Sequence, residues 1–114
     1  PGLLMKLLKQ RWFVRRTEMS SYYLSSKADD DIDDIVDYTL ETWGESQTHI
    51  YVTELYQFLQ TLADNPDLGR SASEFAALLR RYNYKAHTIF YEPTKKGIFV
   101  VRILGQVRDF KRHL

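Results

Sequence analysis

The second half of the chain alternates between apolar and polar positions in the way that is typical of antiparallel β-strands. Residues 88–92 (TIFYE) and 97–104 (GIFVVRIL) are rich in β-branched and aromatic side chains, and residues 93–96 (PTKK) interrupt the pattern between them. A link of this length fits a hairpin and is too short for a parallel crossover. Residues 80–85 (RRYNYK) alternate as well, so the pattern predicts three antiparallel strands.

The alternation within the last of these strands predicts which of its faces is buried. Phe99, Val101 and Ile103 share one wholly apolar face, which we expect to belong to the core. The other face holds one guanidinium among apolar side chains: Ile98, Val100, Arg102 and Leu104. In the first strand tyrosines alternate with charged and polar residues, so we expect a sheet with a basic and aromatic outer surface.

Helical periodicity follows residue 26. Apolar or small side chains recur at the spacing i, i+3, i+4, i+7, i+8, i+11, at Ile32, Ile35, Val36, Thr39, Leu40 and Trp43. Ser26 is the expected N-cap, and Asp29, Asp30 and Asp31 favour the positive end of the helix dipole. Gly44 is a typical residue to end the helix.

A second helix is predicted from about residue 45 to residue 63. Its inner side is apolar: Tyr51, Val52, Leu55, Phe58, Leu59 and Leu62. Asn65-Pro66 ends it, and the short link at Gly44 requires an antiparallel helical hairpin. With residues 21–28 as a short strand that leads into the first helix and residues 67–76 as a loop, the order is β-α-α-β-β-β. We therefore predict an α+β domain whose helical hairpin packs on one face of a small, mainly antiparallel sheet.

The composition narrows the class of protein. The 114 residues suffice for a modest core, and the absence of cysteine excludes disulfides and thiol chemistry. No run of 18 apolar residues occurs, so we expect no membrane-spanning helix and a cytoplasmic location.

The formal net charge of +1 conceals three segments of different sign. Counting Lys and Arg against Asp and Glu, residues 1–18 sum to +4, residues 19–69 to −10 and residues 70–114 to +7. Such a chain either presents a polarised surface that steers charged partners or brings the opposite charges together inside the fold. The sequence leaves both interpretations open.

Residues 1–18 differ from the rest of the chain. They are basic, and their leucines and Trp12 lie near helical spacing. We interpret them as an extension outside the domain of residues 19–114, with Met19 as the natural start. A membrane-surface helix and a partner-binding helix are the alternatives.

Few side chains offer catalytic chemistry. His49, His87 and His113 do not pair at metal-ligand spacing, and no phosphate loop or nucleophile motif is present, so we expect no metal, cofactor or catalytic residue. A basic and aromatic set in the last third of the chain is more suggestive: Arg80, Arg81, Tyr82, Tyr84, Lys85, Arg102, Arg108, Lys111, Arg112 and His113. Such residues suit phosphates and bases, an acidic protein segment, or simply a solvated sheet face.

Residues 19–114 resemble the ParE branch of the RelE/ParE toxin superfamily. The first part of the resemblance lies in the helices and the loop after them: Ala28, Asp31, Ile32, Ile35, Tyr38, Trp43-Gly44, Gln47, Tyr51, Asn65-Pro66 and Gly69-Arg70. The second part lies in the strands and the tail: Leu79-Arg80, Ile89-Phe90-Tyr91, Gly97-Ile98, Val101-Arg102-Ile103-Leu104, Arg108-Asp109 and Arg112-His113-Leu114. The chain departs from the family at Gly105, where a histidine is frequent.

The resemblance implies a toxin of a bacterial type II toxin–antitoxin pair that binds DNA gyrase and is not itself an enzyme. The alternative is a RelE-type endoribonuclease that cleaves mRNA on the ribosome, in which Arg80, Arg81, Arg102 and His113 stabilise the transition state and act as general acid. No tyrosine follows Tyr91 to stack on the RNA, which disfavours that alternative. A third interpretation is an inactive member that only binds its antitoxin.

The residues themselves suggest two contact surfaces for the partners that the resemblance implies. We expect gyrase to bind the tail, which comprises residues 106–114, through Arg108, Phe110, Lys111, Arg112 and His113. We expect the antitoxin, an acidic or amphipathic segment, to wrap the helical hairpin and to run along the last strand at Ile98, Val100, Arg102 and Leu104. The protein would then be a hetero-oligomer with its antitoxin. No membrane partner and no sequence-specific binding of nucleic acid are expected.

Overall fold

The computed structural model describes residues 20–105 and 110–114. Its elements in chain order are β1 (Ser21–Leu24), α2 (Ser26–Trp43), α3 (Glu45–Asp64), β2 (Arg70–Ser71), β3 (Arg80–Tyr84), β4 (His87–Thr94), β5 (Gly97–Gly105) and α4 (Phe110–His113). The predictions for residues 1–18, for the start at Met19 and for Arg108 lie outside the described residues, as does the side chain of Lys111.

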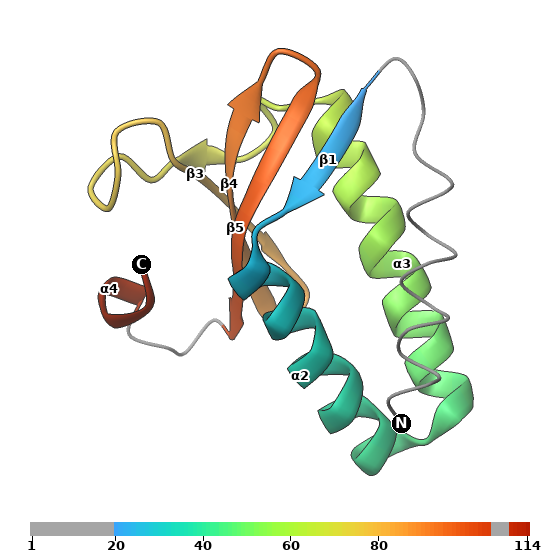
Figure 1. The fold of residues 1–114 in the computed structure, drawn as a ribbon. Coiled ribbons are helices and arrows are strands. Elements are labelled where there is room, and N and C mark those ends of the chain that lie inside the picture. Colours follow the sequence, from blue (N-terminus) through green and yellow to red (C-terminus); the bar gives the residue numbers. More distant parts are fainter. Residues whose placement is uncertain (1–19, 106–109) are drawn as a thin grey trace.

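The fold is a five-stranded sheet with a helical hairpin on one face. The strand order is β1-β5-β4-β3-β2, so β5 lies between the first strand of the chain and its own hairpin partner, β4. β1 is parallel to β5 and all other neighbours are antiparallel. The hairpin of α2 and α3 covers one face of the sheet, and α4 with the loop before β3 lies on the other side (Figure 1). The predicted fold class and the predicted order of elements are confirmed. Two short elements were not predicted: β2, in a segment expected to be a loop, and α4, in the tail.

The first helix starts one residue earlier than predicted. Its N-cap is Ser25, whose Oγ accepts a hydrogen bond from the Ala28 N–H at 2.9 Å and donates to the Val101 carbonyl at 2.7 Å. The cap therefore also fastens the helix to β5. At the other end Gly44, with φ +87°, is the single residue between the two helices and makes the predicted hairpin.

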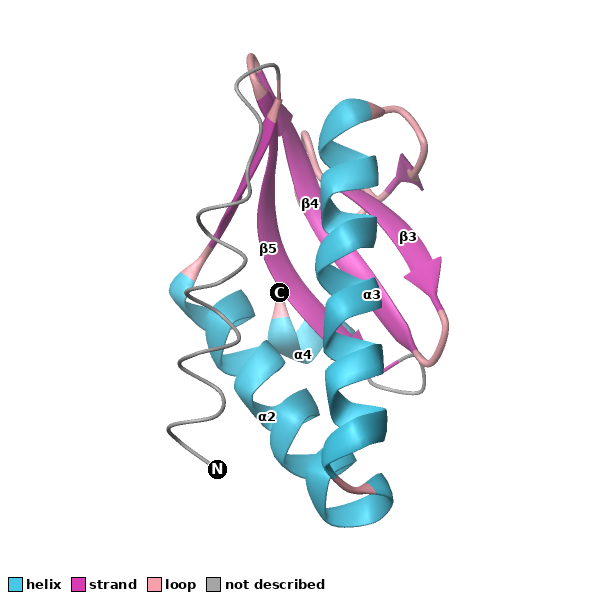
Figure 2. Cartoon of the chain, turned by 90° about the vertical axis from the view of Figure 1, so that its right-hand side faces the viewer, coloured by secondary structure: helices cyan, strands magenta, loops and turns pink. Residues whose placement is uncertain are grey.

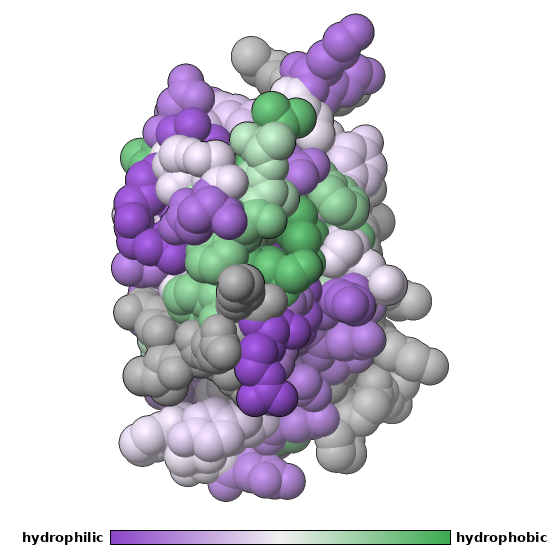
Figure 3. All heavy atoms as spheres, turned by 90° about the vertical axis from the view of Figure 1, so that its left-hand side faces the viewer, coloured by the Kyte–Doolittle hydropathy of each residue, from purple (hydrophilic) through white to green (hydrophobic). Residues whose placement is uncertain are grey.

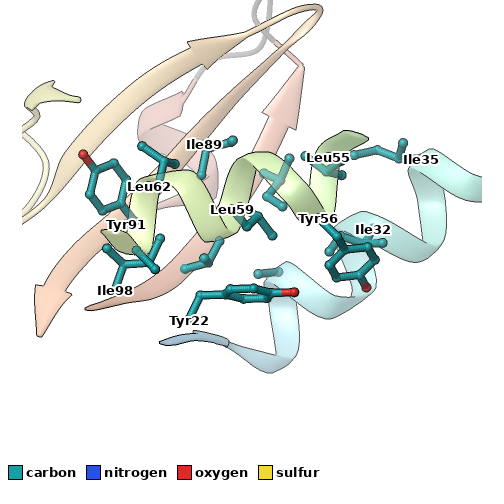
Figure 4. Packing of buried hydrophobic residues seen from close by; sticks show 14 of the residues in the cluster. Tyr22, Ile32, Ile35, Leu55, Tyr56, Leu59, Leu62, Ile89, Tyr91 and Ile98 are labelled. Atoms are coloured by element: carbon teal, nitrogen blue, oxygen red, sulfur yellow. The ribbon is translucent and has the colours of Figure 1, made fainter. Parts of the chain in front are cut away.

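The main core lies between the hairpin and the sheet. Figure 2 shows α3 running across the strands, and Figure 4 shows the packed side chains. The buried apolar residues come from both the helices and the strands: Tyr22, Ala28, Ile32, Ile35, Val36, Val52, Leu55, Tyr56, Leu59, Leu62, Ala63, Ile89, Tyr91, Ile98, Val100 and Ile103.

Tyr82 and Tyr84 of β3 pack on Phe58 of α3, with ring centroids 4.8 and 4.5 Å away. The predicted aromatic outer surface is thus wrong for these tyrosines, which face the helices.

A β-bulge changes the buried face of β5. Phe90 is opposite Arg102 and Tyr91 is opposite Val100, so Val101 has no partner in the ladder. Ile98 and Val100 before the bulge and Ile103 after it belong to the main core. Phe99 is 37% exposed. The predicted core face is therefore wrong for Phe99 and Val101 and right for Ile103.

A second, smaller cluster covers the opposite face of the sheet. It consists of Ala72, Leu79, Phe90 and Leu104, with Phe75, Val101 and Phe110 packed against them. The Phe110 ring meets the Phe90 ring edge-on at 5.0 Å, which holds α4 against the sheet. We call this side, away from the hairpin, the outer face.

Two glycines are required by close approach. A Cβ on Gly97, which has φ +153°, would lie 1.9 Å from the Ser21 carbonyl oxygen, so only glycine lets β1 pair here. A Cβ on Gly69 would lie 2.5 Å from the Tyr91 hydroxyl. That hydroxyl accepts from the Gly69 N–H at 2.8 Å and donates to the Pro66 carbonyl at 2.7 Å, so a core tyrosine fixes the loop after α3.

Candidate functional site

A groove of about 730 Å³ lies between the helical hairpin, α4 and the end of the sheet at which β4 begins and β5 ends. Its walls combine apolar and polar side chains: Asp31, Asp34, Ile35, Tyr38, Thr39, Trp43, Gln47, Tyr51, Ala86, His87, Arg102, Ile103, Leu104, Gly105 and His113. A volume of this size, with a few polar groups among apolar ones, is typical of a binding site.

Two aromatic side chains stand exposed on the hairpin wall of the groove. Tyr38 is 67% exposed and Trp43 is 68% exposed. The helical stripe predicted Trp43 to be inside, but both helices extend beyond the end of the sheet (Figure 1), so the last turn of α2 has no strand to cover it. Exposed aromatics beside a groove mark a surface for a partner.

The floor of the groove contains a largely buried ion pair, in which the Arg102 side chain is 15% exposed and the Asp31 side chain 9%. Arg102 Nε and Nη2 each donate to a different carboxylate oxygen of Asp31 at 2.8 Å, and Asp31 Oδ2 also accepts from the Ile103 N–H at 2.9 Å. Arg102 Nη1 donates to the His113 carbonyl at 2.8 Å. One guanidinium therefore ties α2, β5 and α4 together.

This ion pair corrects the interpretation of Asp31 as a dipole-compensating residue. Asp31 is 8% exposed and makes its bonds to β5. β1 ends at Leu24. Beyond that point, Asp31 accepts a hydrogen bond from a backbone N–H of β5, that of Ile103. The hydrogen bond to Asp31 raises the pKa of Arg102, so the guanidinium stays charged.

Beside the ion pair, Tyr51 and His87 join the hairpin to the sheet. The Tyr51 hydroxyl and His87 Nδ1 are 2.9 Å apart and share a hydrogen bond. Burial raises the pKa of Tyr51 and lowers the pKa of His87. Both shifts favour the neutral side chains, so neither residue brings a charge into the groove at neutral pH.

The residues predicted to bind the antitoxin do not share an exposed surface. Ile98 and Val100 are completely buried under the hairpin, because that part of β5 turns these side chains inward. Leu104 is 4% exposed and belongs to the smaller cluster on the outer face. Only Arg102 and Leu104 of the four line the groove. The expectation of an exposed face at Ile98 and Val100 is wrong, and the antitoxin contact stays a prediction.

The residues predicted to bind gyrase divide into packed and exposed ones. Phe110 packs on Phe90, and the Arg81 guanidinium carbon lies 6.0 Å from the centre of the Phe110 ring. His113 is half-buried and its carbonyl is bonded to Arg102. Arg112 is exposed. Phe110 is therefore an anchor for α4 itself, whereas Arg112 is open to a partner.

The three arginines that the endoribonuclease alternative requires contact different parts of the fold. Arg80 Nε donates to the Gly69 carbonyl at 3.1 Å, and Arg80 Nη2 donates to the Asp67 carbonyl at 3.3 Å. Arg102 is held by Asp31 on α2. The Arg81 guanidinium lies over Phe110 on the outer face. Arg80 and Arg102 are thus each held by another part of the fold, whereas Arg81 and Arg102 lie on either side of Phe90 in the same cross-strand row.

Within the described ranges, no group of three His, Asp or Glu side chains has an arrangement that would hold a metal ion. No helix among the same residues is sufficiently long and apolar to cross a bilayer.

Comparison with known sequences gives a consistent family. The family described as "ParE toxin of type II toxin-antitoxin system, parDE" matches residues 22–110. Toxin ParE1 of Mycobacterium tuberculosis is 38% identical over 96 residues, which are 83% of this chain and 98% of the relative. Toxin ParE1 of Caulobacter vibrioides is 31% identical over 84% of this chain and 99% of the relative. Toxin ParE of Escherichia coli is 30% identical over 84% and 94%.

The fold agrees with these matches. A chain of a solved structure, the chromosomal ParDE TA system from P. aeruginosa, superposes with a TM-score of 0.64, and the match covers 78% of this chain and 98% of that one. Its sequence identity is 19%, so this likeness supports the fold alone. The family match over most of the chain and the three relatives show that this chain belongs to the ParE family of type II toxins.

Proposed function

We propose that this type II toxin acts by binding DNA gyrase, with no reaction of its own, and that an antitoxin neutralises it by occupying the groove. The observation that supports gyrase over mRNA is that two of the arginines that a ribonuclease would need are already engaged within the fold. A ribonuclease needs cations and a general acid around one scissile phosphate. Here the loop after α3 holds Arg80, and Asp31 holds Arg102.

The groove supports the proposed antitoxin site. An amphipathic helix binds such a groove with bulky apolar residues spaced one turn apart, and Tyr38, Trp43 and Ile35 offer it an apolar wall. The solved P. aeruginosa chain belongs to a ParDE toxin–antitoxin system, which agrees with an antitoxin partner and a hetero-oligomer. Ile98 and Val100 contribute indirectly, because they support α2 and α3 from below.

The arrangement also suggests how the antitoxin neutralises the toxin. His113 lines the groove and is held by Arg102, so a helix in the groove contacts α4. The exposed Arg112 is its neighbour on the same short helix. The antitoxin would then obstruct the proposed gyrase contact at the tail.

Two assays run in parallel test the proposal. The purified toxin is titrated into a supercoiling reaction with gyrase, and into a translating ribosome reaction in which cleavage of mRNA is followed. We expect inhibition of supercoiling, reversed by equimolar antitoxin, and intact mRNA. Cleavage of mRNA without any effect on supercoiling would establish the ribonuclease instead.

A further inference from the structure

We propose that the outer face of the sheet is the surface that takes the toxin's target, and that it fits an acidic protein surface bearing bulky apolar side chains. This inference rests on the proposed function, under which that acidic surface belongs to gyrase. It extends the contact from the tail to residues that sequence reasoning did not assign to any partner.

The apolar part of this surface comes from three segments of the chain. Three side chains pack on the cluster of the outer face: Phe75, Val101 and Phe110. With Leu78, on the same loop as Phe75, and Phe99, on the side of β5 opposite to the buried Ile98 and Val100, they make up what we call the outer-face patch. Leu78 is 72% exposed on the loop before β3, and Phe99 is 37% exposed on β5. Figure 3 shows apolar residues gathered on this side of the molecule, with hydrophilic residues around them. A patch of this kind, rimmed by polar side chains, marks a protein interface.

The charges around the patch indicate the sign of the partner. Arg70 and Arg81 are directly opposite each other in the β2–β3 pair, which is unfavourable for like charges. Within the described part of the chain, neither guanidinium forms an ion pair with a carboxylate. Arg81 Nε is buried without a hydrogen-bond acceptor there. Arg112 adds a third cation on α4. Carboxylates of a partner would relieve this repulsion.

The patch favours a protein over a nucleic acid and differs from the groove. Phosphates would meet the arginines but leave Leu78 and Phe99 exposed, whereas a protein surface covers both kinds of side chain. None of the five side chains of the patch lines the groove, and α2 beside the groove is acidic, with Asp34 and Asp37 exposed. Two surfaces of opposite sign suit two different partners.

Two single variants test the proposal. Leu78→Asp removes an apolar contact and adds a repulsive charge, and Arg70→Glu reverses a rim charge. We expect each to raise the concentration that half-inhibits supercoiling by about tenfold or more. Neither should unfold the protein, since Leu78 is exposed and a glutamate at position 70 would face Arg81. An unchanged Tm and an unchanged Kd for the antitoxin would show this.

Matched controls separate the outer face from general effects. Ile50→Asp places the same charge at a half-exposed position of α3, and Lys95→Glu makes the same reversal at the exposed β4–β5 turn. Both controls should inhibit gyrase as the wild type does. If Leu78→Asp and Arg70→Glu also inhibit at the wild-type concentration, the outer face is not the target contact.

Growth arrest on induction distinguishes this inference from the proposed function. If the wild type arrests growth without inhibiting gyrase, gyrase is the wrong target. The outer-face surface then stands only if the two variants lose growth arrest while the controls keep it. If the toxin binds duplex DNA in the absence of gyrase, and Arg70→Glu abolishes that binding, the partner of this surface is a nucleic acid and the proposal of a protein partner is wrong. If Leu78→Asp and Arg70→Glu abolish self-association of the toxin but leave it toxic, the outer face is a contact between copies of this chain, and the proposal is wrong as well.

Discussion

At the scale of single residues, Asp31 shows both what a sequence can indicate and what it leaves open. Five aspartates lie between positions 29 and 34, and the composition of that segment suggests only dipole compensation. Asp31 lies four residues before Ile35 and three after Ala28, so its helical position was the one local signal that it faces inward. Its partner, Arg102, is 71 residues away, and no local pattern connects the two.

The buried ion pair predicts a large effect of a small change. Asp31→Asn removes the charge that Arg102 needs and should lower the free energy of unfolding by about 3 kcal/mol, as expected when one partner of a buried pair is lost. Glu54→Gln is the matched control, because Glu54 pairs with Lys85 on the surface and should cost less than about 1 kcal/mol. Urea unfolding measures both. Equal effects would contradict the structural role of the pair.

His87 predicts a pH dependence of stability. Burial lowers its pKa in the folded chain, so the unfolded chain binds a proton first as the pH falls below about 6.5. The nearby charge of Asp31 opposes this shift but does not cancel it. The contribution of His87 to stability is therefore greatest above that pH and declines as the pH falls towards the lowered pKa of the folded state.

His87→Asn isolates this contribution, because an amide oxygen replaces Nδ1 as the partner of Tyr51 and does not titrate. The free energy of unfolding of the variant should fall less than that of the wild type between about pH 7.5 and pH 5.5. Identical losses in the two proteins would show that His87 has no part in the pH dependence.

At the scale of elements, the helices were predictable and the details of the sheet were not. The helical hairpin follows from the apolar stripes and from Gly44, all local signals. β2 has two residues and no periodicity that could be detected. The bulge at Val101 lies in a strand where nearly every residue is apolar, so the sequence allows either face to be the buried one.

The exposed end of the hairpin predicts where the antitoxin binds. Replacing Tyr38 and Trp43 by serine should weaken antitoxin binding by at least about tenfold, because both side chains are exposed and can fill pockets of a partner. The Tm should change little, as most of each side chain is open to solvent. Ile50→Ser is the control on α3, outside the groove lining. Calorimetric titration with the antitoxin gives the result, and wild-type affinity in the double variant would exclude the groove.

At the scale of the whole molecule, the charge asymmetry of the sequence becomes a difference between two faces. Asp34 and Asp37 lie exposed on α2 beside the groove, and Arg70 and Arg81 lie at the outer face. The class of fold could be predicted from element order alone. The position of β5 between β1 and β4 could not be predicted in this way, because it depends on the parallel pairing of Ser21–Leu24 with a strand at the far end of the sequence.

The central claim is that the toxin binds gyrase through a cationic surface near its tail. The most direct test is the affinity of purified toxin for gyrase, measured by calorimetry, for a triple variant with Arg108, Lys111 and Arg112 replaced by serine. The control is Lys27, Lys95 and Lys96 replaced by serine, which removes equal charge at exposed positions elsewhere. We predict that the tail variant binds at least about tenfold more weakly, whereas the control binds as the wild type does. Wild-type affinity in the tail variant, or no binding by the wild type itself, would contradict the account.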